Sequence, residues 1–144
     1  MSDPIMEFNI FIDNSQISHM ESPYGQVAFI PFTGKVESDL FTGEVLPGGC
    51  DVQVENPAGT RHMCARYMFR GVDSAGNPCH LFVDNNAWFS RANRAEPFTR
   101  ACPRFLTDSP VLGEYLCQSR FRSEVHPAEG GVTIKIFDVL REEQ

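Results

Sequence analysis

Two copies of one short pattern, Phe32-Thr33-Gly34-Lys35-Val36 and Phe41-Thr42-Gly43-Glu44-Val45, lie close together in the chain. Apolar and polar residues alternate in both copies, and a period of two is typical of a β-strand with one buried face. The short segment between the copies is long enough only for a tight connection. We therefore expect an antiparallel hairpin here, and this hairpin indicates an all-β fold.

Similar alternation continues outward from the hairpin, and turn residues recur about every ten residues, which is typical of a sandwich or barrel. One segment, 26–36, contains Pro31, and a proline inside a strand indicates an edge, a bulge or a bend. We expect a single antiparallel β-barrel of about nine strands, at 8–12, 26–36, 41–46, 49–55, 60–72, 77–88, 101–106, 117–125 and 132–140.

A short helix is expected near 109–116. Ser109 can cap its first turn, and Pro110 suits the first helical position. The apolar residues that follow recur at helical spacing and would share one face, namely Val111, Leu112, Tyr115 and Leu116. Such a helix of two turns could close one end of the barrel.

Composition bounds the class of protein. The 144 residues suffice for one domain, 1–144, and twelve phenylalanines supply much of its core. The net charge of −7 argues against nucleic-acid binding, which needs a basic surface. No apolar run approaches the roughly 20 residues of a membrane helix, and the start lacks the features of a secretory signal. We therefore expect a cytoplasmic protein with no membrane partner.

The five cysteines are expected to be reduced and to act as small buried hydrophobes. No two of them have the spacing of a zinc knuckle. Pro47-Gly48-Gly49 lacks the lysine and the following helix of a phosphate-binding loop. We expect neither a metal nor a cofactor.

Pairing the strands with the shortest loops gives a first polar grouping. Glu55 opposite Thr60 would place Asp51 between His62 and Arg66 on one face. The aspartate could hold the histidine tautomer for acid–base chemistry, or Arg66 could bind an anion. The alternative is a cross-strand ion pair on a solvated face, which contributes little to stability. The same rule pairs Gly34 with Gly43, which leaves a dent in the apolar face. The dent is either a barrel corner or slot for a neighbouring aromatic, or room for a ligand.

A second polar grouping follows from pairing Val72 with Asn77. Tyr67, Asp84, Asn86 and Trp88 would then share the face that carries Met63, and His80 could join them. A carboxylate on this mostly apolar face would have its pKa raised by desolvation, which makes Asp84 a candidate general acid or base. The alternative is a buried carboxylate that the backbone and Asn86 satisfy.

Three longer motifs together resemble a bacterial family catalogued as domain of unknown function 3237. They are 41–51, Ala65-Arg66-Tyr67-Met68 and Pro103-Arg104-Phe105-Leu106-Thr107. The resemblance implies a small antiparallel β-barrel, broadly like the lipocalins, and brings no established activity. It places the family's glycine-rich turn and aspartate on Gly48, Gly49 and Asp51, and its arginine–tyrosine pair on Arg66 and Tyr67.

Three functions remain open. The first is binding of a small, largely apolar molecule with one polar or anionic end in the barrel interior, through Arg66, Tyr67, Asn86 and Trp88. The second is a cofactor-free isomerase, cyclase or lyase, with Asp51, His62 and Asp84 as candidate catalytic residues. The third is a non-catalytic homo-oligomeric subunit that associates through outward-facing Met68, Leu81 and Val83.

Overall fold

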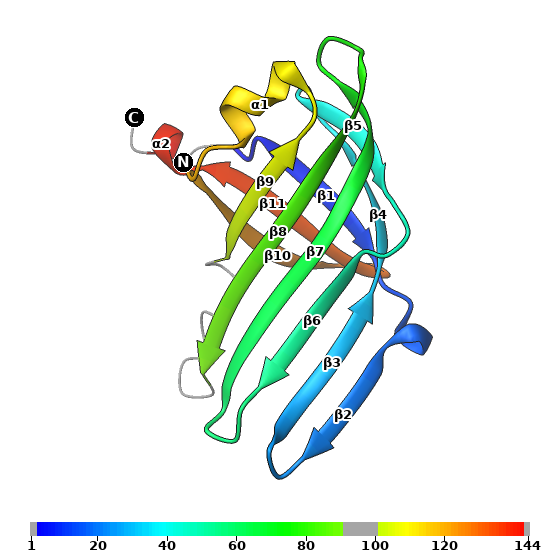
Figure 1. The fold of residues 1–144 in the computed structure, drawn as a ribbon, viewed down its shortest axis with the longest axis vertical. Helices are drawn as coiled ribbons and strands as arrows, with labels where there is room; N and C mark the ends of the chain where they lie inside the picture. The colour runs from blue at the N-terminus through cyan, green and yellow to red at the C-terminus, as the bar shows by residue number, and fades with distance from the viewer. Residues whose placement is uncertain (1–2, 91–100, 143–144) are drawn as a thin grey trace.

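The computed structural model describes residues 3–90 and 101–142, and it shows one strongly curved antiparallel sheet with a short helix at one end (Figure 1). The helices are short: α1 (Pro110–Leu116), α2 (Val139–Glu142) and a 3-10 turn at Asn14–Gln16. The described residues form eleven strands: β1 (Met6–Phe11), β2 (Ser18–Ser22), β3 (Gly25–Pro31), β4 (Thr33–Glu37), β5 (Phe41–Val45), β6 (Cys50–Glu55), β7 (Thr60–Asp73), β8 (Pro78–Ser90), β9 (Cys102–Thr107), β10 (Phe121–Ala128) and β11 (Gly131–Asp138).

Two of these strands were not expected from the sequence. β2 is exposed along almost its whole length, so it carries no apolar alternation. The single strand expected at 26–36 is in fact β3 and β4, which separate at Phe32, directly after Pro31. Phe32 belongs to neither strand, and it donates its backbone N–H to the Gly49 carbonyl at 3.1 Å. The proline therefore marks the point where the chain changes partners, from β6 to β1 and β5.

The sheet is barrel-like, but its ladder is not closed. Neighbouring strands follow the order β10-β11-β1-β4-β5-β7, and β8 and β9 continue from β7. β7 is long enough to pair with β5 and β6 along one edge, and β6, β3 and β2 extend the sheet from there (Figure 1). Where β9 approaches β10, an isolated bridge joins Ala101 to Ser123 in place of a continuous ladder. The structure therefore shows the all-β antiparallel class, while a complete barrel is not shown.

The hairpin between β4 and β5 has a register two residues away from the expected one. Val36 pairs with Gly43, and Lys35 lies directly opposite Glu44. A shift of two residues preserves the faces, so Val36 and Phe41 still point into the core. The expected pairing of Gly34 with Gly43 is wrong.

On its other side, toward β7, Gly43 pairs with Gly71. A Cβ atom on Gly71 would meet the Thr42 carbonyl oxygen and the Gly43 Cα. The glycine pair therefore permits close approach of β5 and β7 and does not open a ligand space between β4 and β5.

The hairpin between β6 and β7 is shifted by one residue, which reverses its faces. Asn56 donates its backbone N–H to the Thr60 carbonyl, Gly59 donates to the Asn56 carbonyl, and the φ of Gly59 is +87°. The loop therefore has three residues and a glycine bulge, whereas the expected register assumed a loop of two residues. Glu55 accordingly pairs with Arg61.

The hairpin between β7 and β8 has the same construction. Asp73 donates to the Asn77 carbonyl, Gly76 donates to the Asp73 carbonyl, and the φ of Gly76 is +80°. Val72 therefore pairs with Pro78 and not with Asn77. A one-residue shift moves every side chain of β8 to the opposite face relative to β7.

The core fills the inner side of the sheet near α1. Ser109 accepts a hydrogen bond from the Leu112 amide at 3.2 Å, which confirms the predicted cap, and Leu112 and Leu116 are buried against the sheet. Val111 is 48% exposed, so it does not share the buried face as expected. The fully buried strand residues around the helix include Phe8, Val36, Phe41, Phe69, Leu81, Val83 and Ile136.

All five cysteines carry free thiols. Cys79 is buried, and Cys50 and Cys64 are half-buried. Cys102 and Cys117 are exposed. The expectation that the cysteines act as buried hydrophobes therefore holds fully for Cys79 alone.

Candidate functional site

The one-residue bulges decide which polar residues reach the interior. In the observed registers Asp51 pairs with Ala65 and lies on the inner face with Tyr67. His62 and Arg66 alternate with these residues and belong to the outer face. The hypothesised grouping of Asp51 with His62 and Arg66 is therefore wrong, because β6 presents the opposite face to the one assumed.

The second hypothesised grouping is also wrong. Tyr67 pairs with Val83, so Asp84 and Asn86 lie on the outer face, and Trp88 there is 59% exposed. His80 is likewise on this outer side, where its Nδ1 lies 2.8 Å from Oδ2 of Asp108.

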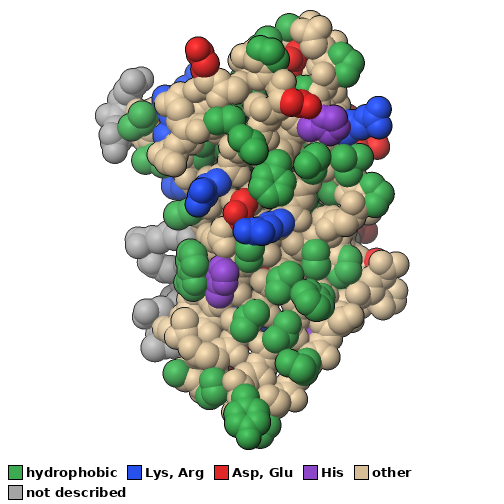
Figure 2. Space-filling view, viewed as in Figure 1, with side chains coloured by type: hydrophobic (Ala, Val, Ile, Leu, Met, Phe, Trp, Pro, Cys, Tyr) green, Lys and Arg blue, Asp and Glu red, His purple; other side chains and the backbone are tan. Residues whose placement is uncertain are grey.

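Outer-face positions were misassigned for the oligomer hypothesis as well. Leu81 and Val83 are fully buried in the core, so neither can form an external contact. Met68 is 39% exposed and remains outside. Figure 2 shows apolar side chains scattered between charged ones on the side of the molecule where β6, β7 and β8 lie in front.

The outer members of the two groupings form one row across β7 and β8. The rings of His62 and Trp88 stack at 4.5 Å, and the His62 Nε2 lies 2.9 Å from the Asn86 Oδ1. Asn86 donates to Asp84 at 2.8 Å, and Arg66 lies 3.6 Å from Asp84 with its side chain 68% exposed. An exposed ion pair of this kind contributes about 0–1 kcal/mol. This row is a network of cross-strand contacts on the outer face, and its ion pair joins Arg66 to Asp84 and not, as the first alternative had assumed, to Asp51.

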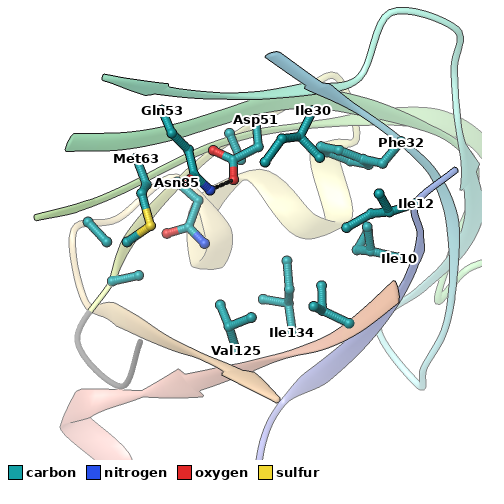
Figure 3. Close-up of a pocket in the computed structure, with 14 residues that line it drawn as sticks. Ile10, Ile12, Ile30, Phe32, Asp51, Gln53, Met63, Asn85, Val125 and Ile134 are labelled. Atoms are coloured by element: carbon teal, nitrogen blue, oxygen red, sulfur yellow. Dashed lines mark hydrogen bonds between the residues drawn. The ribbon is translucent and has the colours of Figure 1, made fainter. Parts of the chain in front are cut away.

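The inner face contains a cavity of about 190 Å³ away from the α1 end (Figure 3). Its walls come from β1, β3, β6, β7, β8, β10 and β11, together with residues beside these strands. The polar lining residues are Asp51, Gln53 and Asn85. The apolar lining residues are Ile10, Ile12, Ile30, Phe32, Met63, Ala65, Ala87, Ala101, Val125, Val132 and Ile134.

Asp51 is the charged group of this cavity. Gln53 donates from Nε2 to Oδ2 of Asp51 at 2.8 Å, and Arg61 in turn donates to Oε1 of Gln53 at 2.9 Å (Figure 3 shows the first bond). Oδ1 of Asp51 is buried and has no hydrogen-bond partner among the described residues. Burial raises the pKa of Asp51 above its usual range, although Gln53, Arg61 and His62 act in the opposite direction.

The other two polar lining residues already have partners. Asn85 exchanges hydrogen bonds with Ser123, at 3.0 Å from its Nδ2 and at 3.2 Å to its Oδ1, and both residues are buried. Gln53 is held between Asp51 and Arg61. Among the lining residues that the structure describes, Asp51 is the one with a buried side-chain oxygen that has no hydrogen-bond partner.

Gln53, Arg61 and Asn85 were not identified from the sequence. All three lie on strands whose faces were assigned with the shorter loops. The signal that could have found them is the pair of turns, Asn56-Pro57-Ala58-Gly59 and Asp73-Ser74-Ala75-Gly76, each with Asn or Asp first and Gly fourth. That pattern favours a type I turn with a glycine bulge.

A second hollow of about 680 Å³ adjoins the glycine-rich turn. It is lined by Pro47, Gly48, Gly49 and neighbouring residues, and it shares Ile12 and Phe32 with the interior cavity. These two apolar side chains thus stand between the interior and the surface. The glycine-rich turn noted in the sequence borders this hollow, while Asp51 faces inward.

The described residues, 3–90 and 101–142, contain no cluster of three or more His, Cys, Asp or Glu side chains able to hold a metal ion. They also contain no helix with the length and apolar character needed to cross a membrane.

Known proteins resemble this chain in sequence and in fold. UPF0311 protein CA_C3321 of Clostridium acetobutylicum is 32% identical over 85 residues, which are 58% of this chain. The match spans about half (51%) of that relative's length. A crystal structure of a protein with unknown function from Clostridium acetobutylicum ATCC 824 has a TM-score of 0.72 at 24% identity, covering 96% of this chain and 99% of that one.

Two other crystal structures share the fold. The conserved protein of unknown function RPA1785 from Rhodopseudomonas palustris has a TM-score of 0.67 at 24% identity, and 93% of each chain is covered. A beta-barrel like protein, ABAYE2633 from Acinetobacter baumannii, also has a TM-score of 0.67, at 18% identity, covering 94% of this chain and 93% of that one. Residues 2–127 match the family described as "Protein of unknown function (DUF3237)". Since this match covers most of the chain, the protein belongs to the DUF3237 family, as its motifs indicated.

Proposed function

We propose that this protein binds a small, largely apolar molecule in its interior cavity and that Asp51 is the polar anchor. The observation that carries the proposal is an apolar cavity of about 190 Å³ whose wall contains one buried carboxylate oxygen without a partner among residues 3–90 and 101–142. One water molecule needs only about 10–15 Å³ by this measure, so the space suits a compact organic molecule. Ligand cavities commonly combine apolar walls with a few polar groups in this way.

The unpaired oxygen also favours an occupant that donates a hydrogen bond. A buried acceptor without a partner costs about 1–3 kcal/mol, and a donor on the ligand would remove that cost. The anionic ligand considered from the sequence depended on Arg66, whose side chain lies outside and is 68% exposed. An anion in the cavity would instead face the carboxylate of Asp51, so the proposal is restricted to neutral molecules and cations.

The cavity proposal includes closure of the sheet. We infer that β9 and β10 form the seam of a barrel that encloses the ligand. The support is the Ala101–Ser123 bridge, in which the Ser123 amide donates to Ala101 at 3.0 Å, together with the barrel-like neighbour. Slow hydrogen exchange of the Ser123 amide in solution would agree with a closed seam, and exchange at the rate of a free edge would contradict it.

Binding is tested with a variant that fills the cavity. Ala87 lines the cavity and is buried, so Ala87→Leu adds three carbon atoms to the wall. Val54→Leu, at a position 45% exposed, is the matched control. In NMR titrations of the wild-type protein with toluene and p-cresol we expect saturable chemical-shift changes. Ala87→Leu should lower the affinity for both compounds about tenfold or more, because the added volume excludes the ligand. Val54→Leu should leave both affinities unchanged.

The result that contradicts the proposal is equally concrete. The proposal is contradicted if the wild-type protein binds neither compound saturably. It is also contradicted if Ala87→Leu binds both compounds as tightly as Val54→Leu does. Native mass spectrometry of the freshly purified protein provides a second measurement, because a molecule retained from the cell would raise the observed mass by a discrete amount.

A second candidate function uses the same carboxylate in proton transfer. Its support is that Asp51 combines an unpaired oxygen, an apolar surrounding and a pKa raised by burial, which are the properties of a general acid or base. The activity would be a cofactor-free isomerisation or elimination. Once a substrate is identified, Asp51→Asn should abolish turnover while binding persists, and full activity of that variant would remove this candidate.

A further inference from the structure

Two buried polar side-chain atoms lack a hydrogen-bond partner within the described residues, and they belong to neighbouring residues. One is Oδ1 of Asp51, and the other is the hydroxyl of Tyr67. Tyr67 is only 3% exposed. Buried polar groups are nearly always paired in folded proteins, so two adjacent exceptions call for a common partner.

The strand register places both side chains on the same face of adjacent strands. Asp51 pairs with Ala65, and Tyr67 is the next inward residue along β7 after Ala65. The position across from Tyr67 is Gly49, where an added Cβ would come within 3.2 Å of the Tyr67 Cβ. With no side chain at Gly49, the inward side chain of that strand diagonal to Tyr67 is Asp51.

Tyr67 is not itself a lining residue of the cavity, but it packs directly behind one, Phe32. The ring of Phe32 lines the cavity and packs edge-on against the Tyr67 ring, with 5.0 Å between centroids. The other ring neighbours of Tyr67, Phe8 and Phe69, belong to the core. The Tyr67 ring therefore lies between Phe32, in the cavity wall, and the aromatic core.

The two atoms have complementary hydrogen-bonding roles. Burial, and then the charge of Asp51, raise the pKa of Tyr67 well above its usual range, so its hydroxyl stays protonated and can donate. The carboxylate oxygen of Asp51 accepts. A partner for both must therefore donate one hydrogen bond and accept another.

We propose that the cavity selects a compact apolar alcohol or phenol, whose hydroxyl donates to Oδ1 of Asp51 and accepts from the Tyr67 hydroxyl. This rests on the proposed binding function and names its ligand class. An ammonium group has no lone pair for Tyr67, and a carboxylate would face the charge of Asp51. A hydrocarbon would leave both atoms unpaired.

Four probes with one aromatic ring separate these cases: p-cresol, toluene, benzylamine and benzoate. We expect p-cresol to bind the wild-type protein about tenfold or more tighter than toluene, because it adds hydrogen bonds to two otherwise unpaired groups. Benzylamine should bind more weakly than p-cresol, and benzoate should bind weakest of the four. NMR titration measures all four affinities under one condition.

Two variants assign the preference to the two atoms. Tyr67→Phe keeps the ring and removes the donor, so we expect p-cresol affinity to fall about five- to tenfold while toluene affinity changes less than about twofold. Tyr115→Phe is the control, because its hydroxyl donates to Asp138 at 2.6 Å, at a distinct site. Asp51→Asn keeps the size of the side chain, exchanges the charged acceptor for a neutral amide, and should also reduce the preference for p-cresol.

The outcomes are distinguishable. Equal affinities for toluene and p-cresol in the wild-type protein, or an unchanged preference in both Tyr67→Phe and Asp51→Asn, would overturn the hydroxyl inference while leaving apolar binding intact. Tighter binding of benzylamine or benzoate than of p-cresol would also overturn it. Binding of none of the four would overturn the proposed function and this inference together.

Discussion

Asp51 places a carboxylate inside the sheet, and Asp51→Asn should therefore stabilise the unliganded protein at neutral and alkaline pH. Burial raises the pKa of this carboxyl above its usual range. The folded state consequently binds the proton more tightly than the unfolded state does. The free energy of unfolding then decreases as the pH rises from the ordinary pKa through the raised one, and the full cost is present above it.

The magnitude follows from the buried charge. A buried acceptor without a partner costs about 1–3 kcal/mol, and more when it is charged. Asparagine keeps an oxygen that can accept from Gln53 and puts a neutral amide nitrogen in the place of the unpaired oxygen, so the gain comes from removing the charge. We expect a gain of about 1–2 kcal/mol at pH 8 that becomes smaller at pH 4, because the raised pKa favours protonation of Asp51 in the folded protein as the pH falls. For a chain of this size the gain corresponds to a Tm increase of about 3–6 °C at pH 8.

Urea denaturation of the wild type and the variant at pH 4 and pH 8 measures this difference. Other carboxyls, such as Asp73 and Asp138, have lowered pKa values and contribute pH dependence of the opposite sign, but they cancel when the two proteins are subtracted. Asp39→Asn removes a charge from an exposed position and serves as the control. A loss of stability at pH 8, or a difference that is the same at both pH values, would refute the reasoning.

Two further predictions concern stability away from the cavity. Asp138→Asn should lower the free energy of unfolding by about 2–3 kcal/mol in urea titrations. The reason is that the fully buried carboxylate accepts two hydrogen bonds of 2.9 Å from Arg120 and one from Tyr115. An unchanged urea midpoint would contradict this role. Gly113→Ala should raise the free energy of unfolding by up to about 1 kcal/mol, because Gly113 lies in α1 and there is open space around its Cβ position. Gly76→Ala should lower the free energy of unfolding, because the φ of Gly76 is +80°. Equal effects of the two substitutions on Tm would contradict the turn assignment.

The local elements were predictable from the sequence because their signals are local. Ser109 and Pro110 specify the start of α1 through one hydrogen bond and one fixed backbone angle. The period of two in the remaining segments correctly indicated strands. β2 carries no such period because nearly all its side chains are exposed, so its position depends on pairing with β3 and not on its own pattern.

Strand faces were harder to predict because both sides of this sheet carry apolar residues. Met68, Leu106 and Trp88 are exposed on the outside, so apolar character alone could not identify the inner face of β7 and β8. The loop lengths therefore set which face points inward, and an error of one residue in a loop reverses the predicted face. The information was present in the side chains of the turns: Asn56 accepts from the Thr60 amide and Asp73 from the Asn77 amide, each at 3.0 Å.

The two incorrectly predicted registers, those of the β6–β7 and β7–β8 hairpins, both involve β7. This explains how the hypothesised sites relate to the observed one. Each hypothesis combined residues of β7 with the wrong face of a neighbour, β6 in one case and β8 in the other. Restoring the bulges exchanges the partners, so that Asp51 joins Tyr67 inside and Asp84 joins His62 and Arg66 outside. The residue types chosen from the sequence were therefore reasonable candidates, but chemistry that requires a dry environment is available only to the inner pair. The sharpest test of that division is the comparison of p-cresol with toluene, which differ by the one hydroxyl that Asp51 and Tyr67 would bind.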